Sequence, residues 1–314
     1  MSAGATKGKG NLGSIVSIAT ANFIWGISFL LMRIAMEACG QKEFLYLSSR
    51  FSLATLVMIL VFGVIRRQKF SLKGKNVGRY VALIIMEPVY FISETLMLKY
   101  SNSVFTGVAM SLGPVFSIVF AAIFLKEIPT VKKWLLMLLP VLGVALMTFV
   151  GRSMGTVQPL GIVFMLLTCV AQGAIRTLQR SASREFSTYE RTVGGMFSCA
   201  VTFTLVNLFT SGFNFGEYAA FGNLSFMIPV VLLVVFASVI ANSLSNYASG
   251  KLPVMYVAIF GAFCTVVSVV AGVVFLKEPM TWLSALGVIL AIVGIILINL
   301  PEKQKTVPES GEKQ

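Results

Sequence analysis

The sequence FLKEIPT at residues 124–130 returns as FLKEPMT at residues 275–281, in the other half of the chain. Each copy follows a long apolar run, although charged residues are few in this sequence. A motif repeated in this way indicates that the chain is built from two related units.

The composition is that of a membrane protein. Of the 314 residues, 57% are hydrophobic and 12% are charged, with a mean hydropathy of +0.88, whereas soluble domains carry about 25% charged residues. Ten apolar runs of about 20 residues are each long enough to cross a bilayer core of about 30 Å as a helix. The predicted spans are residues 14–36, 44–65, 77–98, 103–125, 131–150, 158–180, 191–211, 226–248, 253–276 and 281–300. The sequence thus predicts an all-α integral membrane protein with polar tails at residues 1–13 and 301–314.

The FLKE motif is one of several matches between the halves. Aligning the halves places further residues on each other: Gly143 on Gly294, Gly26 on Gly173, Tyr90 on Asn242 and Glu94 on Asn246. These matches predict a five-helix unit at residues 14–150 and a second at residues 151–300. Because five is odd, the second unit enters the membrane upside down, so the halves are predicted to be inverted repeats. Many secondary transporters use this architecture for alternating access.

Basic residues gather on one side of this arrangement. The formal net charge of +13 by itself suggests nucleic-acid binding. With ten spans and the N-terminus inside, however, most lysines and arginines fall in inner tails and loops, as the positive-inside rule requires. The outer loops hold only Lys42, Lys99, Arg152 and Lys277. We therefore expect both termini in the cytoplasm, no nucleic-acid partner, and inner loops that contact anionic lipid, in a membrane taken to be the bacterial inner membrane.

The residues that other functions need are missing from the sequence. The chain has no histidine and no aspartate, and its four cysteines have neither framework nor zinc spacing. A metal site, a disulfide scaffold and an enzyme active site are therefore not expected, and no cofactor is predicted. A phosphate-binding loop of the P-loop type is also missing, so a gradient or a partner must supply the energy for any transport.

Three stretches resemble the drug/metabolite transporter superfamily, EamA type: IWGISF at residues 24–29, SRFSLA at residues 49–54, and LKYSNSVFTGVAMSLGPVFSIVFAAIFLKEIPT at residues 98–130. The resemblance covers residues 14–300 and is thinner at the front of the second half, where Ala171-Gln172-Gly173 replaces the Trp-Gly signature. It implies a ten-helix carrier with cytoplasmic termini and a cavity lined mainly by the first, third, fourth, sixth, eighth and ninth helices. Such carriers commonly export amino acids, other metabolites or drug-like molecules.

Glu87 and Glu94 lie inside a predicted span, whereas the other glutamates lie in loops, tails or helix ends. A charged group within a bilayer costs about 2.5 to 3.5 kcal/mol on insertion scales, so both are candidates for a functional role. Because they are seven residues apart, they share one helix face, on which Tyr90 and Phe91 also lie. We predict that this face contributes to the substrate cavity.

Depth along the helix separates the two glutamates. At about 1.5 Å per residue, Glu94 lies about 6 Å below the predicted outer boundary and Arg50 about 9 Å below it. Arg50, or else Arg33 near the outer end of the first helix, can therefore form an ion pair with Glu94 that serves as a gate or a packing contact. Direct contact between Glu94 and substrate is the alternative. Arg176 is expected to extend to the cytoplasmic interface, or else to attract an anionic substrate from inside.

Glu87 lies about 15 Å from the inner boundary by the same measure, near the midplane, where no cation shares its depth. An unpaired carboxylate there retains its proton strongly. That property suits proton coupling, and it equally suits a permanently protonated Glu87 that bonds to a neighbouring helix. Pro88 has no N–H, so the carbonyl of Ile84 loses its helical partner and the helix is expected to bend.

Trp25 also falls near the midplane, and Gly26 beside it permits close approach of another helix. In the second half, Gln172, Asn242 and Asn246 are polar side chains within spans. Each of these amides either lines the cavity or pairs with a helix carbonyl. For a cationic or aromatic substrate, the indole and the rings of the third helix offer faces for cation–π or stacking contacts.

Together these features predict a secondary transporter, an exporter of small metabolites such as amino acids or drug-like compounds. It would work by alternating access and be driven by protons or by exchange. A sugar-phosphate or nucleotide-sugar exchanger is the alternative. A channel would need a ring of charges or carbonyls, and a membrane enzyme a cluster of acid, base or nucleophile, neither of which the sequence offers. The oligomeric state is left open.

Overall fold

The computed structural model describes residues 4–125, 130–252, 257 and 260–299, and this part of the chain is helical without strands. Eight of its helical segments are long and apolar enough to cross a membrane. Two further apolar helices, Gly261–Phe275 and Trp282–Leu297, are shorter. The predicted all-α integral membrane architecture is confirmed, and ten spans remain a prediction.

The helices follow the predicted spans closely. In chain order they are α1 (Gly4–Ala38), α2 (Glu43–Met58), η1 (Ile59–Ile65), α3 (Val77–Lys99), α4 (Ser103–Ala109), η2 (Met110–Leu112), α5 (Gly113–Leu125), α6 (Val131–Leu136), α7 (Leu138–Ser153), α8 (Pro159–Ala182), α9 (Thr188–Thr210), η3 (Phe215–Gly222), α10 (Leu224–Leu232), η4 (Leu233–Ala241), α11 (Asn242–Lys251), α13 (Gly261–Phe275) and α14 (Trp282–Asn299). Several elements join end to end, so that α4, η2 and α5 form one span, and α10, η4 and α11 another.

Polar side chains cap the starts of several helices. The first N–H groups of a helix have no partner within it and need another acceptor. At α9, Ser187 and Glu190 satisfy two such groups reciprocally in a capping box. Asparagine side chains do so at the starts of α3, α4, η3 and α10, where the capping residues are Asn76, Asn102, Asn214 and Asn223.

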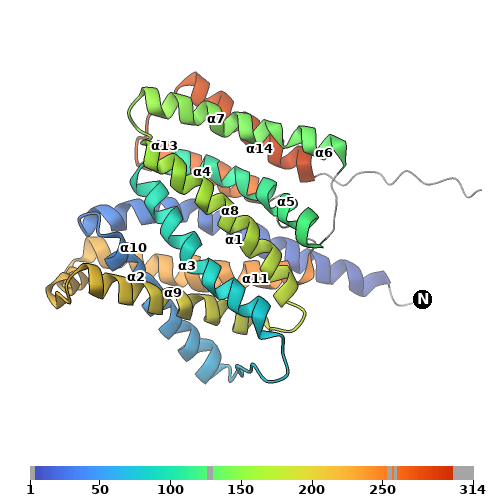
Figure 1. Cartoon of the computed structure of the whole chain (residues 1–314), viewed down its shortest axis with the longest axis vertical. Coiled ribbons are helices and arrows are strands. Elements are labelled where there is room, and N and C mark those ends of the chain that lie inside the picture. The colour runs from blue at the N-terminus through green and yellow to red at the C-terminus, as the bar shows by residue number, and fades with distance from the viewer. Residues whose placement is uncertain (1–3, 126–129, 253–256, 258–259, 300–314) are drawn as a thin grey trace, which may run out of the picture.

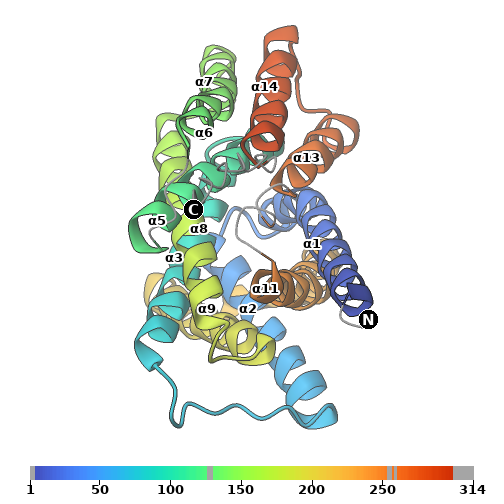
Figure 2. The same ribbon diagram turned by 90° about the vertical axis from the view of Figure 1, so that its right-hand side faces the viewer.

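The two halves contribute equivalent helices to each packed pair. In Figure 2, α5, α8 and α3 lie along one side of the molecule, and α13, α1 and α11 along the other. The α1 helix packs on α13 and on the span of α10, η4 and α11, and in the same way α8 packs on α5 and on α3. The remaining pairs, α7 with α14 and α2 with α9, lie at opposite edges (Figure 1).

Glycines bring α7 and α14 into close contact. A Cβ on Gly143 would lie 2.5 Å from the carbonyl oxygen of Gly287 and 2.8 Å from the backbone nitrogen of Ala291. On the other side of the crossing, a Cβ on Gly294 would collide with Pro140. Small residues allow helix backbones to approach in a membrane. The aligned pair Gly143 and Gly294 therefore lies at one helix crossing.

The second FLKE copy ends α13. Lys277 has a positive φ of 53°, the left-handed conformation that commonly terminates helices. The backbone N–H groups of Leu276 and Glu278 both donate to the carbonyl of Gly272, each at 3.2 Å. Residues 126–129 of the first copy lie outside the described residues.

Glu278 also reaches across to the other half. Its carboxylate accepts hydrogen bonds from the backbone N–H groups of Ser103 at 2.8 Å and Val104 at 2.7 Å, at the start of α4. The side chain of Asn102 accepts from the next N–H, that of Phe105, at 2.8 Å. A carboxylate from the second half thus completes the cap of a helix in the first.

Candidate functional site

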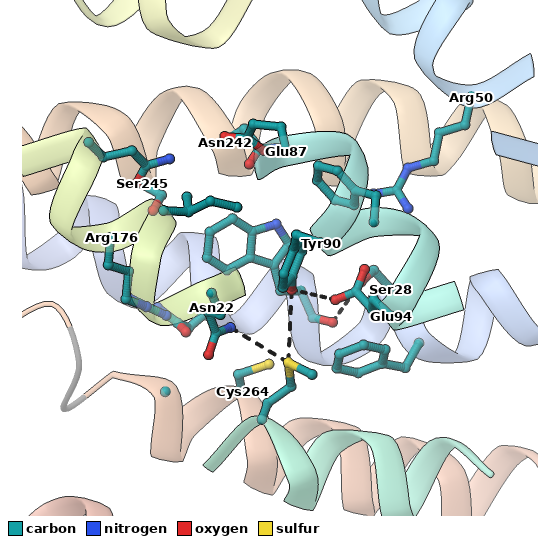
Figure 3. Close-up of a pocket in the computed structure, with 18 residues that line it drawn as sticks. Asn22, Ser28, Arg50, Glu87, Tyr90, Glu94, Arg176, Asn242, Ser245 and Cys264 are labelled. Carbon is teal, nitrogen blue, oxygen red and sulfur yellow. Dashed lines mark hydrogen bonds between the residues drawn. The ribbon is translucent and has the colours of Figure 1, made fainter. Parts of the chain in front are cut away.

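A cavity of about 800 Å³, with the solvent at its mouth included, lies between the two halves (Figure 3). Its walls come from α1, α2, α3, η2, α8, α11 and α13. Both halves therefore supply the lining.

Helical spacing of three and four residues aims side chains of four helices into this cavity. The stripes are Asn22, Trp25, Ser28 and Phe29 on α1; Glu87, Tyr90, Phe91 and Glu94 on α3; Gln172, Ile175, Arg176 and Gln179 on α8; and Asn242 and Ser245 on α11. The cavity thus brings together most of the residues that the sequence predicts for it, and Arg50 of α2 joins them. Asn246 and Arg33 are not part of the lining.

Glu94 is bound by a tyrosine and forms no ion pair within the described residues. The hydroxyl of Tyr90 donates to its carboxylate at 2.5 Å. The guanidinium of Arg50 instead donates to the hydroxyls of Ser238 at 3.0 Å and Tyr46 at 2.9 Å. The expected ion pair of Glu94 with Arg50 is therefore replaced by bonds to neutral hydroxyls, one of them on the other half.

Aromatic rings also cover Arg50. Its guanidinium carbon lies 5.2 Å from the ring centroid of Phe51 and 5.6 Å from that of Phe91, within the range of cation–π attraction. The residue is only 2% exposed. Arg50 is therefore held by rings and hydroxyls at the edge of the cavity.

Arg33 lies outside the cavity and does not contact Glu94. It forms an ion pair with Glu37, one turn along its own helix, at 2.7 Å. Its guanidinium also donates to the carbonyls of Leu98 at 3.4 Å and Ser101 at 3.3 Å, at the end of α3. The expected gate contact is wrong for this residue, because Glu37 and carbonyls at the end of α3 bind the guanidinium instead.

Asn246 is buried away from the cavity. Its side-chain amide donates to the hydroxyl of Thr192 at 2.9 Å, and its backbone carbonyl accepts from Arg191 at 2.8 Å. Asn242, one turn earlier, does line the cavity, and its amide donates to the carbonyl of Ala237 at 3.2 Å. Of the two asparagines, only Asn242 remains a candidate for contact with a solute.

Glu87 is buried in the cavity wall, with 7% of its surface exposed. It packs against Gly195 of α9, where an added Cβ would lie 3.2 Å from its side chain. The side chain of Gln179 interacts with its carboxyl group. Within the described residues Glu87 forms no ion pair, so proton coupling and a permanently protonated state both remain open.

The carbonyl that Pro88 leaves without a partner finds one on another helix. The hydroxyl of Ser198 on α9 donates to the carbonyl of Ile84 at 2.6 Å. The α3 helix continues through the proline without a break in its assignment. A transverse hydrogen bond to α9 therefore replaces the bond that α3 lacks.

Trp25 lies on the cavity wall, as predicted, and Gly26 beside it faces α13. A Cβ on Gly26 would lie 2.6 Å from Cβ of Val267, so the glycine permits the close approach of α1 and α13. The sulfur of Met110, which was not predicted, accepts from the amide of Gln172 at 3.6 Å and lies 3.8 Å from the hydroxyl oxygen of Tyr90, whose proton is donated to Glu94. This methionine links the α3 and α8 stripes.

Arg176 lines the cavity. It follows Gln172 by one helical turn, and both line the cavity. Nε of Arg176 and Oε1 of Gln172 are buried without a hydrogen-bond partner in the described structure. Whether Arg176 also extends to the cytoplasmic interface stays a prediction, and its four-residue spacing from Gln172 is the signal that places both on one helix face.

The fold and this cavity define an integral membrane protein with a polar-lined cavity between two halves. The model of the EamA-like transporter family matches residues 12–149 and again residues 159–300, and the chain belongs to that family. The family predicted from the motifs is thereby confirmed, and the family indicates a membrane transporter.

Relatives and a solved structure agree with this assignment. The uncharacterized transporter YcxC of Bacillus subtilis is 28% identical over 293 residues, which cover 91% of this chain and 92% of that protein. An uncharacterized transporter of Archaeoglobus fulgidus is 24% identical, over 90% of this chain and 97% of its own. A chain of known crystal structure superposes with a TM-score of 0.64 at 19% identity, over 90% of this chain and 95% of its own, and shows the fold alone.

Proposed function

We propose that the protein is a secondary transporter, and specifically an exporter, that moves a small solute through the central cavity by alternating access. The observation that carries this proposal is a cavity between the halves whose polar lining comes from both repeats. Alternating access needs such a site between two units that move relative to each other. Such a carrier performs no chemical reaction on its solute.

The packing of the halves supports ten spans in two inverted repeats, at residues 14–150 and 151–300. If each helix is replaced by its equivalent in the other half, the contact of α1 with α13 becomes the contact of α8 with α5. The pairs α7 with α14 and α2 with α9 each remain the same pair. A two-fold axis in the membrane plane would produce this pattern.

Two arginines at equivalent positions of the halves, Arg33 and Arg180, also make similar contacts. Arg33 binds carbonyls at the end of α3, and Arg180 binds those of Ser249 at 3.5 Å and Gly250 at 3.0 Å near the end of α11.

The basic loops support an orientation with both termini in the cytoplasm of a bacterial cell, in its inner membrane. Under this orientation the loop between η1 and α3, which holds several basic residues, faces anionic lipid. Reporter fusions at either end test the orientation, because a reporter active only in the cytoplasm must then be active at both.

Transport is tested in two steps. The purified protein is screened by thermal shift against amino acids, amines, nucleobases and sugar phosphates, because a ligand of the folded form raises its melting temperature. Stabilising solutes are then loaded into proteoliposomes. A carrier gives saturable flux that unlabelled solute on the far side accelerates. Flux that neither saturates nor exchanges contradicts the proposal, and a chemically altered solute would indicate an enzyme.

Glu87 is the proposed coupling residue, because it is a buried cavity carboxyl group without an ion pair in the described structure. In Glu87→Gln, which cannot release a proton, we expect uptake driven by a pH gradient to fall to background while counter-exchange continues. Both rates are measured in proteoliposomes, with Glu37→Gln at the exposed end of α1 as the matched control. Full gradient-driven uptake by Glu87→Gln would remove the coupling role.

A further inference from the structure

We propose that Arg33 and Arg180 are the gate residues of the cavity, each of which holds one mouth closed by binding carbonyls at the end of a helix of the opposite wall. The inference rests on the transport function proposed above and names the contacts that break when each mouth opens. Arg33 acts through these carbonyls, without the contact with Glu94 that the sequence suggested.

The cavity lies between two walls. One wall is formed by α1, α11 and α13, and the other by α3 and α8. Within the walls, α1 packs on α11 and α13, and α8 packs on α3. Figure 2 shows the two groups of helices on opposite sides of the molecule. In a carrier of this kind, a mouth opens when the two walls separate at one end.

Each arginine lies just beyond one end of the cavity. Arg33 follows the lining residue Phe29 by four residues on α1, and Arg180 follows the lining residue Arg176 by four residues on α8. Four residues along a helix return to the same face, so each arginine continues the stripe of side chains that lines the cavity. Glu94 and Arg176 lie toward opposite ends of the cavity in Figure 3. In the proposed orientation, the end beside Glu94 is the outer mouth and the end beside Arg176 is the inner mouth.

At the outer mouth, Arg33 connects the two walls. From α1 its guanidinium donates to the carbonyls of Leu98 at 3.4 Å and Ser101 at 3.3 Å, at the end of α3 and in the turn that follows. Carbonyls at the end of a helix carry partial negative charge and attract a cation. The ion pair of Arg33 with Glu37 lies within α1, so it is retained when the walls separate. Glu278, which follows α13, binds the start of α4 beyond the same turn.

At the inner mouth, Arg180 connects the walls in the opposite direction. From α8 its guanidinium donates to the carbonyls of Ser249 at 3.5 Å and Gly250 at 3.0 Å, near the end of α11. Each wall therefore supplies one arginine and one helix end. The two contacts occupy equivalent positions of the halves and lie at opposite mouths.

Contacts at opposite mouths bias the two access states in opposite directions. Loss of the contact of Arg33 favours the state that is open at the outer mouth, and loss of the contact of Arg180 favours the state that is open at the inner mouth. A contact that exists in only one of two states shifts their populations by its own free energy. A general loosening of the fold would instead open both mouths.

The thiol of Cys264, which lines the cavity from α13, reports which mouth is open. Sealed membrane vesicles that contain the full chain are prepared right side out and inside out. A membrane-impermeant maleimide is added to each preparation, so that it reaches the cavity through the outer mouth or through the inner mouth. Mass spectrometry of the digested protein then gives the labelling rate of Cys264 separately from those of the other three cysteines. The measurement needs no transported solute.

In Arg33→Gln we expect the ratio of the labelling rates of Cys264 through the outer and inner mouths to rise about two- to fivefold, the range expected for a cation at a helix end. In Arg180→Gln we expect the ratio to fall by a similar factor. The lysine variants of both positions keep the charge but lose the planar fork, so their ratios should be intermediate. Arg152→Gln and Arg184→Gln, at exposed positions near the outer and inner faces, are the matched controls, because each also removes a surface charge.

An unchanged ratio in both glutamine variants, or a shift in the same direction in both, overturns the inference. Labelling of Cys264 from neither side in any of these proteins also overturns it, because neither mouth then opens. Cys169 and Cys199 are fully buried and outside the lining, so their labelling identifies a variant that is not folded. The lysine variant then provides the test at that position.

The outcome also separates the gates from the transport function. If proteoliposomes exchange a solute while the labelling ratio does not shift, the gate assignment is wrong and the carrier function stands. If the ratio shifts as expected and no solute is exchanged, the two mouths open alternately and the proposed transport fails.

Discussion

The hydroxyl of Ser198 supplies the carbonyl of Ile84 with the hydrogen bond that Pro88 cannot provide. In an apolar environment an unpaired carbonyl is costly, because no water is present to replace the lost donor. The proline therefore removes one hydrogen bond within α3, and the carbonyl it frees forms a hydrogen bond to α9, beside Glu87.

We predict that Ser198→Ala lowers the free energy of unfolding by about 0.6 to 2 kcal/mol, because the carbonyl of Ile84 then remains buried without a donor. The melting temperature of the purified protein reports the change. Ser17→Ala is the control, since that hydroxyl binds only the carbonyl of Gly13, which is on its own helix and retains its ordinary partner. Equal melting of Ser198→Ala and wild type would mean that another group or a water satisfies the carbonyl.

The close crossing of α7 and α14 depends on glycines, which have no side chain, at the points of contact. A methyl group on Gly143 would meet backbone atoms of Gly287 and Ala291, which cannot turn aside as a flexible side chain can. The two helices would have to separate along their whole contact. The same is true of Gly294 against Pro140 from the other side.

We predict that Gly143→Ala destabilises the protein by about 1 to 3 kcal/mol, the usual cost of overpacking, although alanine favours helix formation. Thermal melting measures the loss. Gly13→Ala, in α1, where nothing lies within 4 Å of the new methyl group, should melt at or slightly above the wild-type temperature. If both variants melt alike, the α7–α14 crossing tolerates separation.

The loop between η1 and α3, in the first half of the chain, is hydrogen-bonded to α9 in the second half. The carboxylate of Glu190, at the start of α9, accepts from Lys75 at 2.6 and 2.7 Å and from the backbone of Ser71 at 3.0 Å. Lys75 also lies 4.8 Å from the ring of Phe186. Charged hydrogen bonds of this kind fix the position of the segment that connects η1 and α3.

We predict that Glu190→Gln increases hydrogen–deuterium exchange in residues 66–76, because the charge that binds Lys75 is lost. Exchange followed by mass spectrometry measures the effect, which should be partly reproduced in wild type by raising the salt concentration. Glu37→Gln, whose partner Arg33 belongs to the same helix, should leave this segment unchanged. Unchanged exchange in Glu190→Gln would show that backbone contacts alone hold the loop.

The sequence predicts those parts of the molecule that depend on one helix at a time. The positions of the spans and the common face of Glu87, Tyr90, Phe91 and Glu94 follow from hydropathy and from 3.6 residues per turn. It cannot predict which neighbour a polar group selects. The partner of Ile84 and the hydroxyls that bind Arg50 depend on how helices from both halves pack.

The cap that Glu278 places on α4 has a consequence for assembly. Two N–H groups at the start of α4 have their acceptor in the second half, so the first half alone would lack this cap. A chain cut after Gly155 should therefore be recovered only when its two fragments are produced together. Each half is thus one repeat of the sequence, and we expect the two halves to fold only together.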